Sequence, residues 1–238
     1  MGSLKSSAPL PGGLVDYRGF RLSKLNTPEF SHLLLLLFWP VYGLVFYTLE
    51  RGITTNYHVV HAPLDDRIPF CELFLIPYLF WFVFLVGMLA YLLFFDVEGF
   101  RKFMYFVILT YTATCVIYIV WPSMQNLRPE TFQRDNALTR FMADFYAFDT
   151  NTNVCPSLHV IGSFAAMFGG WHTKRFSTPA WRATLAVITL LISISTVFLK
   201  QHSVLDIPPA LLLSLIAYIL VYRTKLFCKK KSAPSQAA

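Results

Sequence analysis

Long apolar segments separated by short polar stretches are the dominant pattern of this chain. Each apolar segment has 17 to 25 residues, and a helix of that length crosses a hydrocarbon core of about 30 Å. Glu72 and Asp206 are the charged residues within the segments, and both lie close to a segment start, away from the bilayer centre where charge is most costly. We therefore expect an all-α, polytopic integral membrane protein with six transmembrane helices. The helices are predicted at residues 33–49, 71–95, 103–122, 156–172, 183–199 and 204–222.

The composition supports a membrane protein. Hydrophobic residues make up 55% of the 238 residues, charged residues only 14%, and the mean hydropathy is +0.52. A soluble domain of this size has about 25% charged residues, so soluble, disordered and fibrous classes are excluded. The net charge is +7, but the basic residues are scattered and form no stripe with interleaved aromatics. We expect the lipid bilayer as a partner and no nucleic acid.

The distribution of Lys and Arg predicts the orientation of the helices. Fourteen of these residues fall on the side that carries both termini, and six fall on the other side. Basic residues accumulate on the cytoplasmic side of membrane proteins. Both termini are therefore predicted to be cytoplasmic, in the cell membrane, and the loops 50–70, 123–155 and 200–203 are predicted to face outward.

Three regions follow from this topology. Residues 1–30 form an amphipathic cytoplasmic segment, residues 31–226 the six-helix membrane domain, and residues 227–238 a basic cytoplasmic tail. The outer loop 123–155 is long and mixes charges with aromatics such as Phe141 and Phe145. Long loops are usually functional or disordered, and the aromatic content argues against disorder. We expect an amphipathic segment there that lies on the bilayer surface or covers a site.

Ser157, Leu158 and His159 stand at the predicted start of the fourth helix, directly after Pro156. Proline is favoured at the first helical position, because its missing N–H would have no partner there. The free amides of the first turn and the positive end of the helix favour a bound anion. The same residues are also typical of a plain helix start with an interfacial histidine, so both interpretations stay open.

His202 and Asp206 lie four residues apart between the fifth and sixth helices, with Lys200 just before them. A carboxylate at this spacing can orient an imidazole and stabilise its charged form, as catalytic dyads require. Ser203 and Asp206 also fit a capping box, and Asp206 itself can cap a helix that starts with the prolines after it. Capping alone does not explain Lys200 and His202 beside it.

Arg128 lies at the outer end of the third helix and is followed by Pro129. An arginine presents a planar fork of donors that suits phosphate oxygens. The predicted topology brings Arg128, the Ser157–His159 turn and the Lys200–Asp206 segment to the same face of the membrane. This convergence favours a phosphate site over three unrelated helix ends.

The order and spacing of these residues resembles the type 2 phosphatidic acid phosphatase superfamily, whose motifs run approximately Lys-x6-Arg-Pro, Pro-Ser-Gly-His and Ser-Arg-x5-His-x3-Asp. The matching residues are Arg128-Pro129, Pro156-Ser157-x-His159 and Ser195-x6-His202-x3-Asp206. The chain departs from the motifs at Trp121, Leu158 and Thr196, which replace the lysine, the glycine and the arginine. The sequences around His159 and His202 look more like the branch that contains inositol phosphorylceramide synthases than like the bacterial acid phosphatases.

The resemblance implies a helical core of the phosphatidic acid phosphatase and haloperoxidase kind and a chemical role for each matched residue. His202 would attack phosphorus and form a phosphohistidine, Asp206 would hold its ring, and His159 would protonate the leaving oxygen and then activate the acceptor. Arg128, Lys200, Ser157 and the amide of Leu158 would bind the phosphate, with Lys200 supplying the missing charge. The scheme needs no metal and no cofactor. The substrate would be a membrane lipid phosphate, and the acceptor water or another hydroxyl compound.

Two other functions stay open. A headgroup transferase of the inositol phosphorylceramide synthase kind would pass the phosphoryl group to a hydroxyl other than water. A non-catalytic lipid binder or transporter is suggested by the missing lysine and arginine. The presence of His159, His202 and Asp206 favours an enzyme, because a protein that only binds needs no nucleophile and no proton donor.

The first outer loop contains His58 and His61, followed by two aspartates. The pattern allows a metal site, but the spacing places no third ligand, so contact with lipid headgroups is favoured. Cys71 and Cys155 both fall on the outer face, where a disulfide between them is an open alternative.

Overall fold

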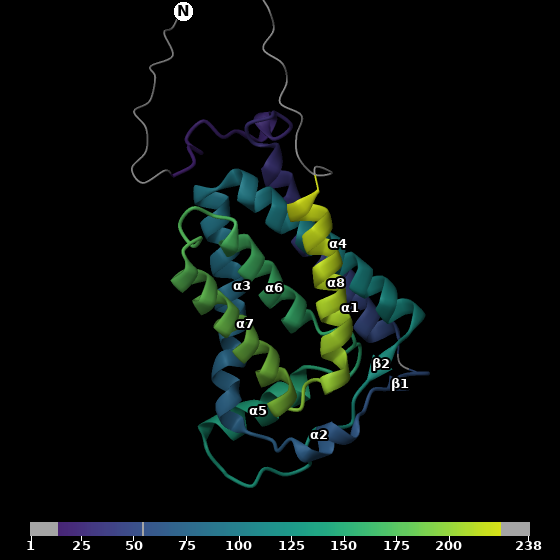
Figure 1. Ribbon diagram of the computed structural model, residues 1–238. Coiled ribbons are helices and arrows are strands. Elements are labelled where there is room, and N and C mark those ends of the chain that lie inside the picture. Colours follow the sequence, from purple (N-terminus) through teal and green to yellow (C-terminus); the bar gives the residue numbers. More distant parts are fainter. Residues whose placement is uncertain (1–13, 54, 225–238) are drawn as a thin grey trace, which may run out of the picture.

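The computed structural model describes residues 14–53 and 55–224, which are mostly helical (Figure 1). Residues 1–13 of the predicted N-terminal segment and the whole predicted basic tail, 227–238, lie outside these residues. Short 3-10 turns occupy Leu22–Lys24, Ser31–Leu37, Glu72–Phe74 and Val204–Asp206, and Ile219–Arg223 forms a π turn. The helices are α1 (Phe38–Gly52), α2 (Pro63–Arg67), α3 (Leu75–Phe95), α4 (Val97–Val120), α5 (Ala137–Phe148), α6 (Leu158–Trp171), α7 (Pro179–Phe198) and α8 (Ile207–Tyr218).

Six apolar helices correspond to the six predicted spans, but their lengths differ from the prediction. Five helical stretches within residues 14–53 and 55–224 are long and apolar enough to cross a membrane, namely Ser31–Gly52, Glu72–Phe95, Val97–Val120, Pro179–Phe198 and Val204–Arg223. The fourth predicted span is α6, which has only 14 residues and is about 21 Å long. The prediction of six full-length transmembrane helices is therefore not confirmed for α6.

The start of α6 explains its short length. The sequence predicted Pro156 at the first position of the helix. In the structure Ser157 is the N-cap residue, so Pro156 lies just before the helix. Residues 153–157 are buried although they are not helical. Non-helical backbone is tolerated at membrane depth where protein surrounds it or where it lines a cavity.

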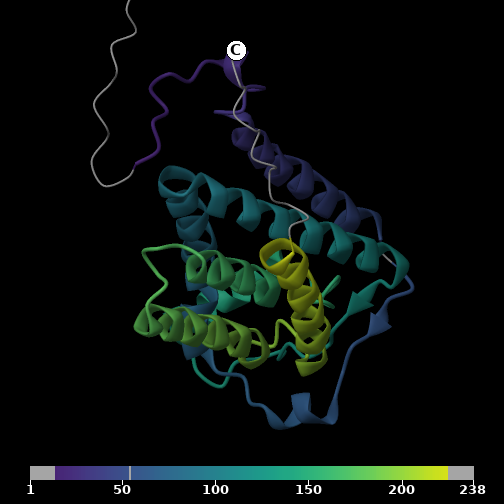
Figure 2. The same ribbon diagram turned by 45° about the horizontal axis from the view of Figure 1, so that its top comes forward.

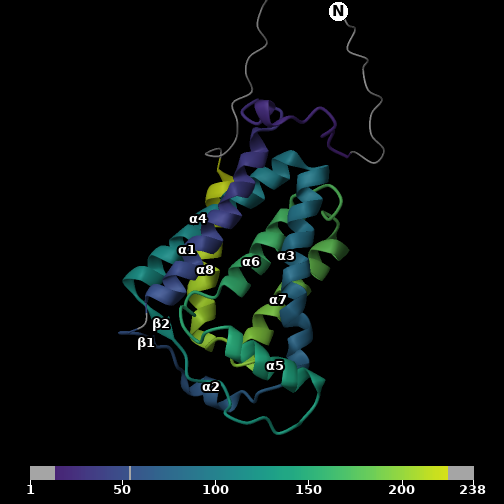
Figure 3. The same ribbon diagram turned by 180° about the vertical axis from the view of Figure 1, so that it is seen from behind.

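Helix α6 lies at the centre of the bundle, where it packs against α3, α4, α7 and α8 (Figures 1 and 2). Glycines on α6 allow this close approach. A Cβ atom at Gly162 would lie 2.8 Å from Tyr111 Oη, and one at Gly170 would lie 2.6 Å from Leu185 Cδ1. Small residues at helix interfaces are typical of membrane bundles. By contrast, α1 lies on the outside, against α4 (Figures 2 and 3).

The segments that contain α2, α5, β1 and β2 lie at one end of the helices, while residues 14–31 and the end of the last helical segment lie at the other end (Figure 1). Strands β1 (His58–Val59) and β2 (Ser123–Met124) pair in parallel and join the first two outer loops. The amphipathic segment predicted in the loop 123–155 is present as α5. Its Met142 is fully buried in a cluster with Leu75 and Leu199, whereas Phe148 is 87% exposed. Helix α5 therefore covers the loop ends of α3 and α7.

Candidate active site

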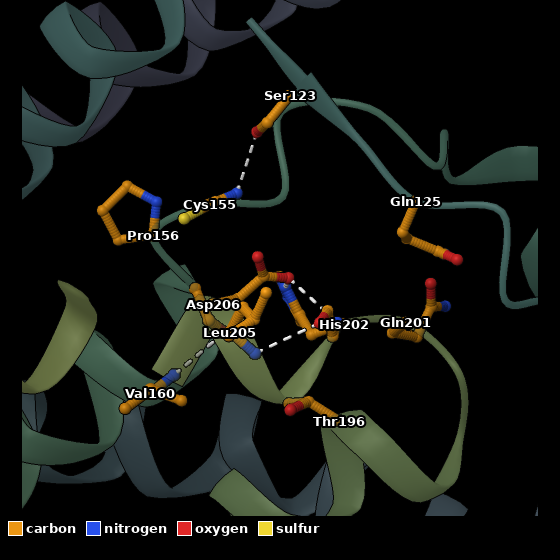
Figure 4. Close-up of polar contacts among 12 residues, drawn as sticks. Ser123, Gln125, Cys155, Pro156, Val160, Thr196, Gln201, His202, Leu205 and Asp206 are labelled. Carbon is orange, nitrogen blue, oxygen red and sulfur yellow. Dashed lines mark hydrogen bonds and ion pairs between the residues drawn. The ribbon is translucent and has the colours of Figure 1, made fainter. Parts of the chain in front are cut away.

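A hydrogen-bonded pair of His202 and Asp206 lies in the segment between α7 and α8 (Figure 4). The Nδ1 atom of His202 is 2.9 Å from Oδ2 of Asp206. His202 is 8% exposed and Asp206 is fully buried. With the proton on Nδ1 donated to the carboxylate, Nε2 retains its lone pair. This is the tautomer that a nucleophilic histidine requires.

Asp206 also has the structural role that the sequence left open. Its Oδ2 accepts a hydrogen bond from the Ser203 amide at 3.1 Å, which completes the capping box. Its backbone carbonyl accepts a hydrogen bond from the Ser157 amide at 3.3 Å. The two interpretations of Asp206 are therefore compatible, and the cap holds the start of α6 against the His202 segment.

His159 lies in the first turn of α6 and faces the dyad. The ring centroids of His159 and His202 are 6.0 Å apart. Two aromatic residues of α3 pack on the His159 ring, with centroid distances of 4.4 Å to Tyr78 and 4.5 Å to Trp81. The buried Nε2 of His159 has no hydrogen-bond partner among the residues that the structure describes. The ring is thus fixed by stacking, and its Nε2 is available to a substrate.

Both histidines line a cavity of about 80 Å³ at the loop end of the bundle. Leu158 lines it as well, so the first turn of α6 contributes to the wall. The remaining lining residues come from α1, α3, α4 and the loops, and they are Phe46, Glu50, Tyr78, Tyr118, Asp149, Thr150, Thr152, Asn153, Val154 and Gln201. Because the two histidines belong to different predicted motifs, the cavity joins residues that are distant in the sequence.

Arg128 lies beside this cavity but does not line it. Its guanidinium donates hydrogen bonds to the carbonyl oxygens of Tyr146, Asp149 and Thr150 and to Oε1 of Gln201, at 2.7 to 3.0 Å. Its Nη2 is also 3.7 Å from Oδ2 of Asp149. Protein oxygens thus occupy the two terminal nitrogens that were predicted to bind phosphate, whereas the buried Nε has no partner among the described residues. Arg128 therefore holds the loop after α5 against Gln201.

Lys200 lies in a second cavity, of about 580 Å³, which Asp65, Glu72 and Arg134 also line. Its Nζ donates to the backbone carbonyl of Asp65 at 2.6 Å, and burial lowers the pKa of its ammonium group. Lys200 has a φ of 53°, a left-handed conformation that turns the chain sharply. The residue expected to supply the missing charge thus lies outside the cavity of the two histidines.

Ser157 is fully buried, and its Oγ accepts the Val160 amide as the N-cap of α6. The positions that depart from the family motifs hold no cation. Trp121 stacks on His58 with a centroid distance of 5.2 Å. The carbonyl of Thr196 accepts the amides of Gln201 and His202, which shapes the turn before the dyad.

Asp65 is a site residue that sequence reasoning considered only as part of a metal pattern. It is fully buried. Its Oδ2 accepts the Ser203 hydroxyl at 2.6 Å and its Oδ1 accepts the Val204 amide at 2.9 Å. A carboxylate from the first outer loop therefore fixes the segment that carries His202. Asp65 is 138 residues from Ser203 in the sequence. No motif includes both residues, so this contact was not predicted.

The remaining outer-loop predictions have clear outcomes. His61 pairs with Asp66 at 2.8 Å, and the described residues include no group of three or more His, Cys, Asp or Glu that could hold a metal ion. Cys71 and Cys155 are free thiols, so the suggested disulfide is wrong. Burial raises the pKa of the Cys155 thiol to about 12, and the nearby Asp206 carboxylate adds to this shift. Cys155 is therefore a protonated, inert neighbour of the dyad.

The sequence profile of the PAP2 superfamily matches residues 102–230, which is more than half of the chain. The chain belongs to the PAP2 superfamily. This superfamily generally comprises phosphatases and phosphotransferases, and the apolar helices fit a membrane enzyme of that kind. The matched range includes all three predicted motifs. No curated protein and no solved structure matches the chain.

Proposed function

We propose that this PAP2 protein transfers the phosphoryl group of a membrane lipid through a phosphohistidine at His202. The observation that carries the proposal is the buried 2.9 Å contact between His202 Nδ1 and Asp206 Oδ2, in a cavity that His159 also lines. A histidine that only stabilised the fold would need neither an oriented Nε2 nor a second histidine across a cavity.

The proposed reaction has two steps. In the first, Nε2 of His202 attacks phosphorus, the bond from phosphorus to the lipid oxygen breaks, and His159 gives its proton to the leaving oxygen. Asp206 stabilises the positive charge on the His202 ring. In the second step, His159 takes a proton from the acceptor hydroxyl, which attacks phosphorus and frees His202. Water as acceptor gives a phosphatase, and a lipid or polyol hydroxyl gives a transferase.

The positions of the other residues revise their proposed roles. The amides at the N-terminus of α6, near Leu158, and the side-chain amides of Asn153 and Gln201 are the donors available to phosphate oxygens in the cavity. Arg128 acts as a positioning residue, because its fork holds the loop after α5 and Oε1 of Gln201. We assign Lys200 no contact with the phosphate.

The distribution of basic residues supports an outward-facing site. Fourteen of the twenty Lys and Arg residues lie on the side of both termini, and the cavity lies at the opposite end of the helices. We therefore place both termini in the cytoplasm, the cavity at the extracytoplasmic face of the cell membrane, and the substrate in the outer leaflet.

The test compares purified wild-type protein with His202→Ala in lipid vesicles. We expect the release or transfer of lipid phosphate to fall at least about 1,000-fold in the variant, because the nucleophile is lost. His61→Ala, which removes an exposed histidine of the same face, is the control and should retain wild-type activity. Activity of His202→Ala at the wild-type rate would show that the proposal is wrong.

The choice of acceptor separates the two enzymatic functions. Incubation of diacyl and ceramide lipids with and without a polyol should give inorganic phosphate for a phosphatase and a new lipid for a transferase of the inositol phosphorylceramide synthase kind. Failure to trap a phosphohistidine, together with lipid-phosphate binding that His202→Ala leaves unchanged, would instead identify a non-catalytic lipid binder or transporter.

A further inference from the structure

The cavity of the two histidines is acidic, although the proposed substrate carries a phosphate. Glu50 and Asp149 line it, and the described lining residues include no Lys or Arg. Arg128 is close, but it does not line the cavity, and its Nη1 and Nη2 already bind protein oxygens. A phosphomonoester carries a charge of about −1.5 to −2 at pH 7. Two carboxylates without a free cation would repel such a group.

The two carboxylates come from different parts of the chain and lie near each other. Glu50 is in the last turns of α1, where its Oε1 accepts the Thr150 hydroxyl at 2.7 Å. Asp149 is the residue before Thr150. Burial raises the pKa of Asp149 to about 6, and the charge of Glu50 adds to the shift while Arg128 opposes it. Arg128 offsets the charge of Asp149, and within the part of the chain that the structure describes Glu50 forms no ion pair with a Lys or Arg.

Two side-chain amides in the same cavity have N–H groups without a partner among the described residues, and these groups point to a missing ligand. Asn153 is 4% exposed, and neither its Oδ1 nor its Nδ2 has a hydrogen-bond partner among the described residues. Gln201 is 3% exposed, and its Nε2 is equally unpartnered. A buried polar group without a partner is costly. Both amides line the cavity, where their N–H groups suit phosphate oxygens without adding charge.

Aromatic side chains complete the wall near the carboxylates. Phe46 lies one helical turn before Glu50 on α1, and Tyr78 and Tyr118 line the cavity from α3 and α4. Aromatic faces attract ammonium groups, and the attraction increases when the cation is desolvated. Because Tyr78 stacks on His159, Phe46 and Tyr118 are the rings that join the two carboxylates in a wall that fits a cation, while the histidines and the neutral amides fit a phosphate.

We propose, on the basis of the proposed function, that the donor substrate is a zwitterionic phospholipid whose phosphodiester carries a choline or ethanolamine headgroup. The ammonium group lies against Glu50 and Asp149, and the phosphate lies between His202 and the amides of Asn153 and Gln201. A cavity of about 80 Å³ accommodates part of a headgroup and excludes an acyl chain. The glycerol side of the lipid therefore remains in the bilayer.

This orientation fixes which bond breaks. Nε2 of His202 forms a bond to phosphorus, the bond from phosphorus to the diacylglycerol oxygen breaks, and the proton of His159 goes to that oxygen. The headgroup phosphate stays on His202, held by its ammonium group. An acceptor hydroxyl then attacks phosphorus and gives its proton to His159. Diacylglycerol is the first product whatever the acceptor is, so its formation measures the first step alone.

The experiment measures diacylglycerol formation by the full-length protein in vesicles of one matched acyl composition. The substrates are phosphatidylcholine, phosphatidylethanolamine, phosphatidylglycerol and phosphatidic acid, each with ceramide present as a hydroxyl acceptor. We expect phosphatidylcholine or phosphatidylethanolamine to react at least about tenfold faster than the two anionic lipids, a size that a desolvated ammonium contact supports.

Charge-removing variants test the assignment of the residues. Glu50→Gln and Asp149→Asn should each lower the rate with the preferred zwitterionic lipid about tenfold, and they should leave or raise the rate with phosphatidic acid. Asp144→Asn removes an exposed carboxylate of α5 on the same face and serves as the control with an unchanged lipid preference. Asp149→Asn also removes the ion pair with Arg128 and can therefore disturb the loop. Glu50→Gln leaves that ion pair in place, so it tests the cationic headgroup independently.

The outcomes separate the inference from the function on which it rests. Faster reaction with phosphatidic acid or phosphatidylglycerol, abolished in His202→Ala, would retain the proposed function and overturn the cationic headgroup. Equal losses on all lipids in Glu50→Gln would also overturn it, because a structural defect does not discriminate between headgroups. No reaction with any lipid would contradict the proposed function itself.

Discussion

The two cavities at the loop end of the helices have no lining residue in common and differ in their chemistry. The smaller cavity contains both histidines, two carboxylates and unpartnered amide nitrogens, and its described lining has no Lys or Arg. The larger one contains two cations, Lys200 and Arg134, together with Asp65, Asp66 and Glu72. Lys200 and Gln201, adjacent in the chain, line different cavities. The Lys200 side chain, which is two residues from His202 in the sequence, therefore lies in a different cavity from the His202 ring. Proximity in sequence therefore does not establish that a charge acts at the reacting phosphate.

The largest effect is expected from removal of Asp65, which lines the larger cavity and binds the segment that carries His202. Asp65→Ala would leave the Ser203 hydroxyl and the Val204 amide without their buried acceptor. We expect the free energy of unfolding to fall by about 3 kcal/mol and the rate of diacylglycerol formation to fall about 100-fold, because the His202 segment loses its support. Thermal unfolding in detergent and vesicle assays measure both effects.

Asp66→Ala is the matched control for this variant. Asp66 is exposed and pairs with His61 at the surface, where an ion pair contributes about 0–1 kcal/mol. Wild-type activity and stability are expected. Equal losses in the two aspartate variants would show that the first outer loop acts as a whole and that Asp65 has no specific role.

A smaller effect is expected when Lys200 is replaced by methionine. The substitution removes the charge but keeps most of the side-chain volume, and its Nζ contacts the Asp65 carbonyl instead of the histidine cavity. The rate should fall by no more than about threefold, as for the loss of one hydrogen bond that supports the fold. A fall comparable to that of His202→Ala would place Lys200 at the phosphate and remove the distinction between the cavities.

The smallest predicted effect concerns the pH dependence of stability. The folded pKa of Asp149, about 6, lies above the ordinary value of 3.8, so the folded state binds this proton more tightly than the unfolded state. Asp149 therefore destabilises the protein progressively as pH rises from about 4 to 6. Solvent screening reduces the effect, because its side chain is 38% exposed.

Thermal unfolding of wild-type protein and Asp149→Asn at pH 4.5 and 7 measures this contribution. Relative to the variant, the wild-type Tm should be about 1–3 °C lower at pH 7 than at pH 4.5. An unchanged difference between the two pH values would mean that Asp149 retains an ordinary pKa, and the acidic character of its cavity would need another explanation.

The sequence predicted the membrane class and the positions of the helices because burial in lipid requires long apolar runs, which are local features of the chain. It also predicted the His202–Asp206 contact, because four residues of separation suffice to join them. The start of α6 was predicted at Pro156, two residues before its observed first residue, because Pro156 also fits the first position of a helix. The backbone before α6 is instead held by Ser123, whose carbonyl accepts the Asn153 amide and whose hydroxyl accepts the Cys155 amide.

Which cavity each charged side chain near the dyad lines or contacts depends on long-range contacts of the tertiary structure. Arg128 has the donors for a phosphate, but carbonyl oxygens of α5 and of the loop after it bind its Nη1 and Nη2. Lys200 precedes His202 by two residues, yet its left-handed backbone turns it into the other cavity. Glu50, Asp149 and Asn153 meet through packing between distant segments. Residue types and local spacing determined the fold class and the dyad, whereas long-range contacts determined the charge around the dyad.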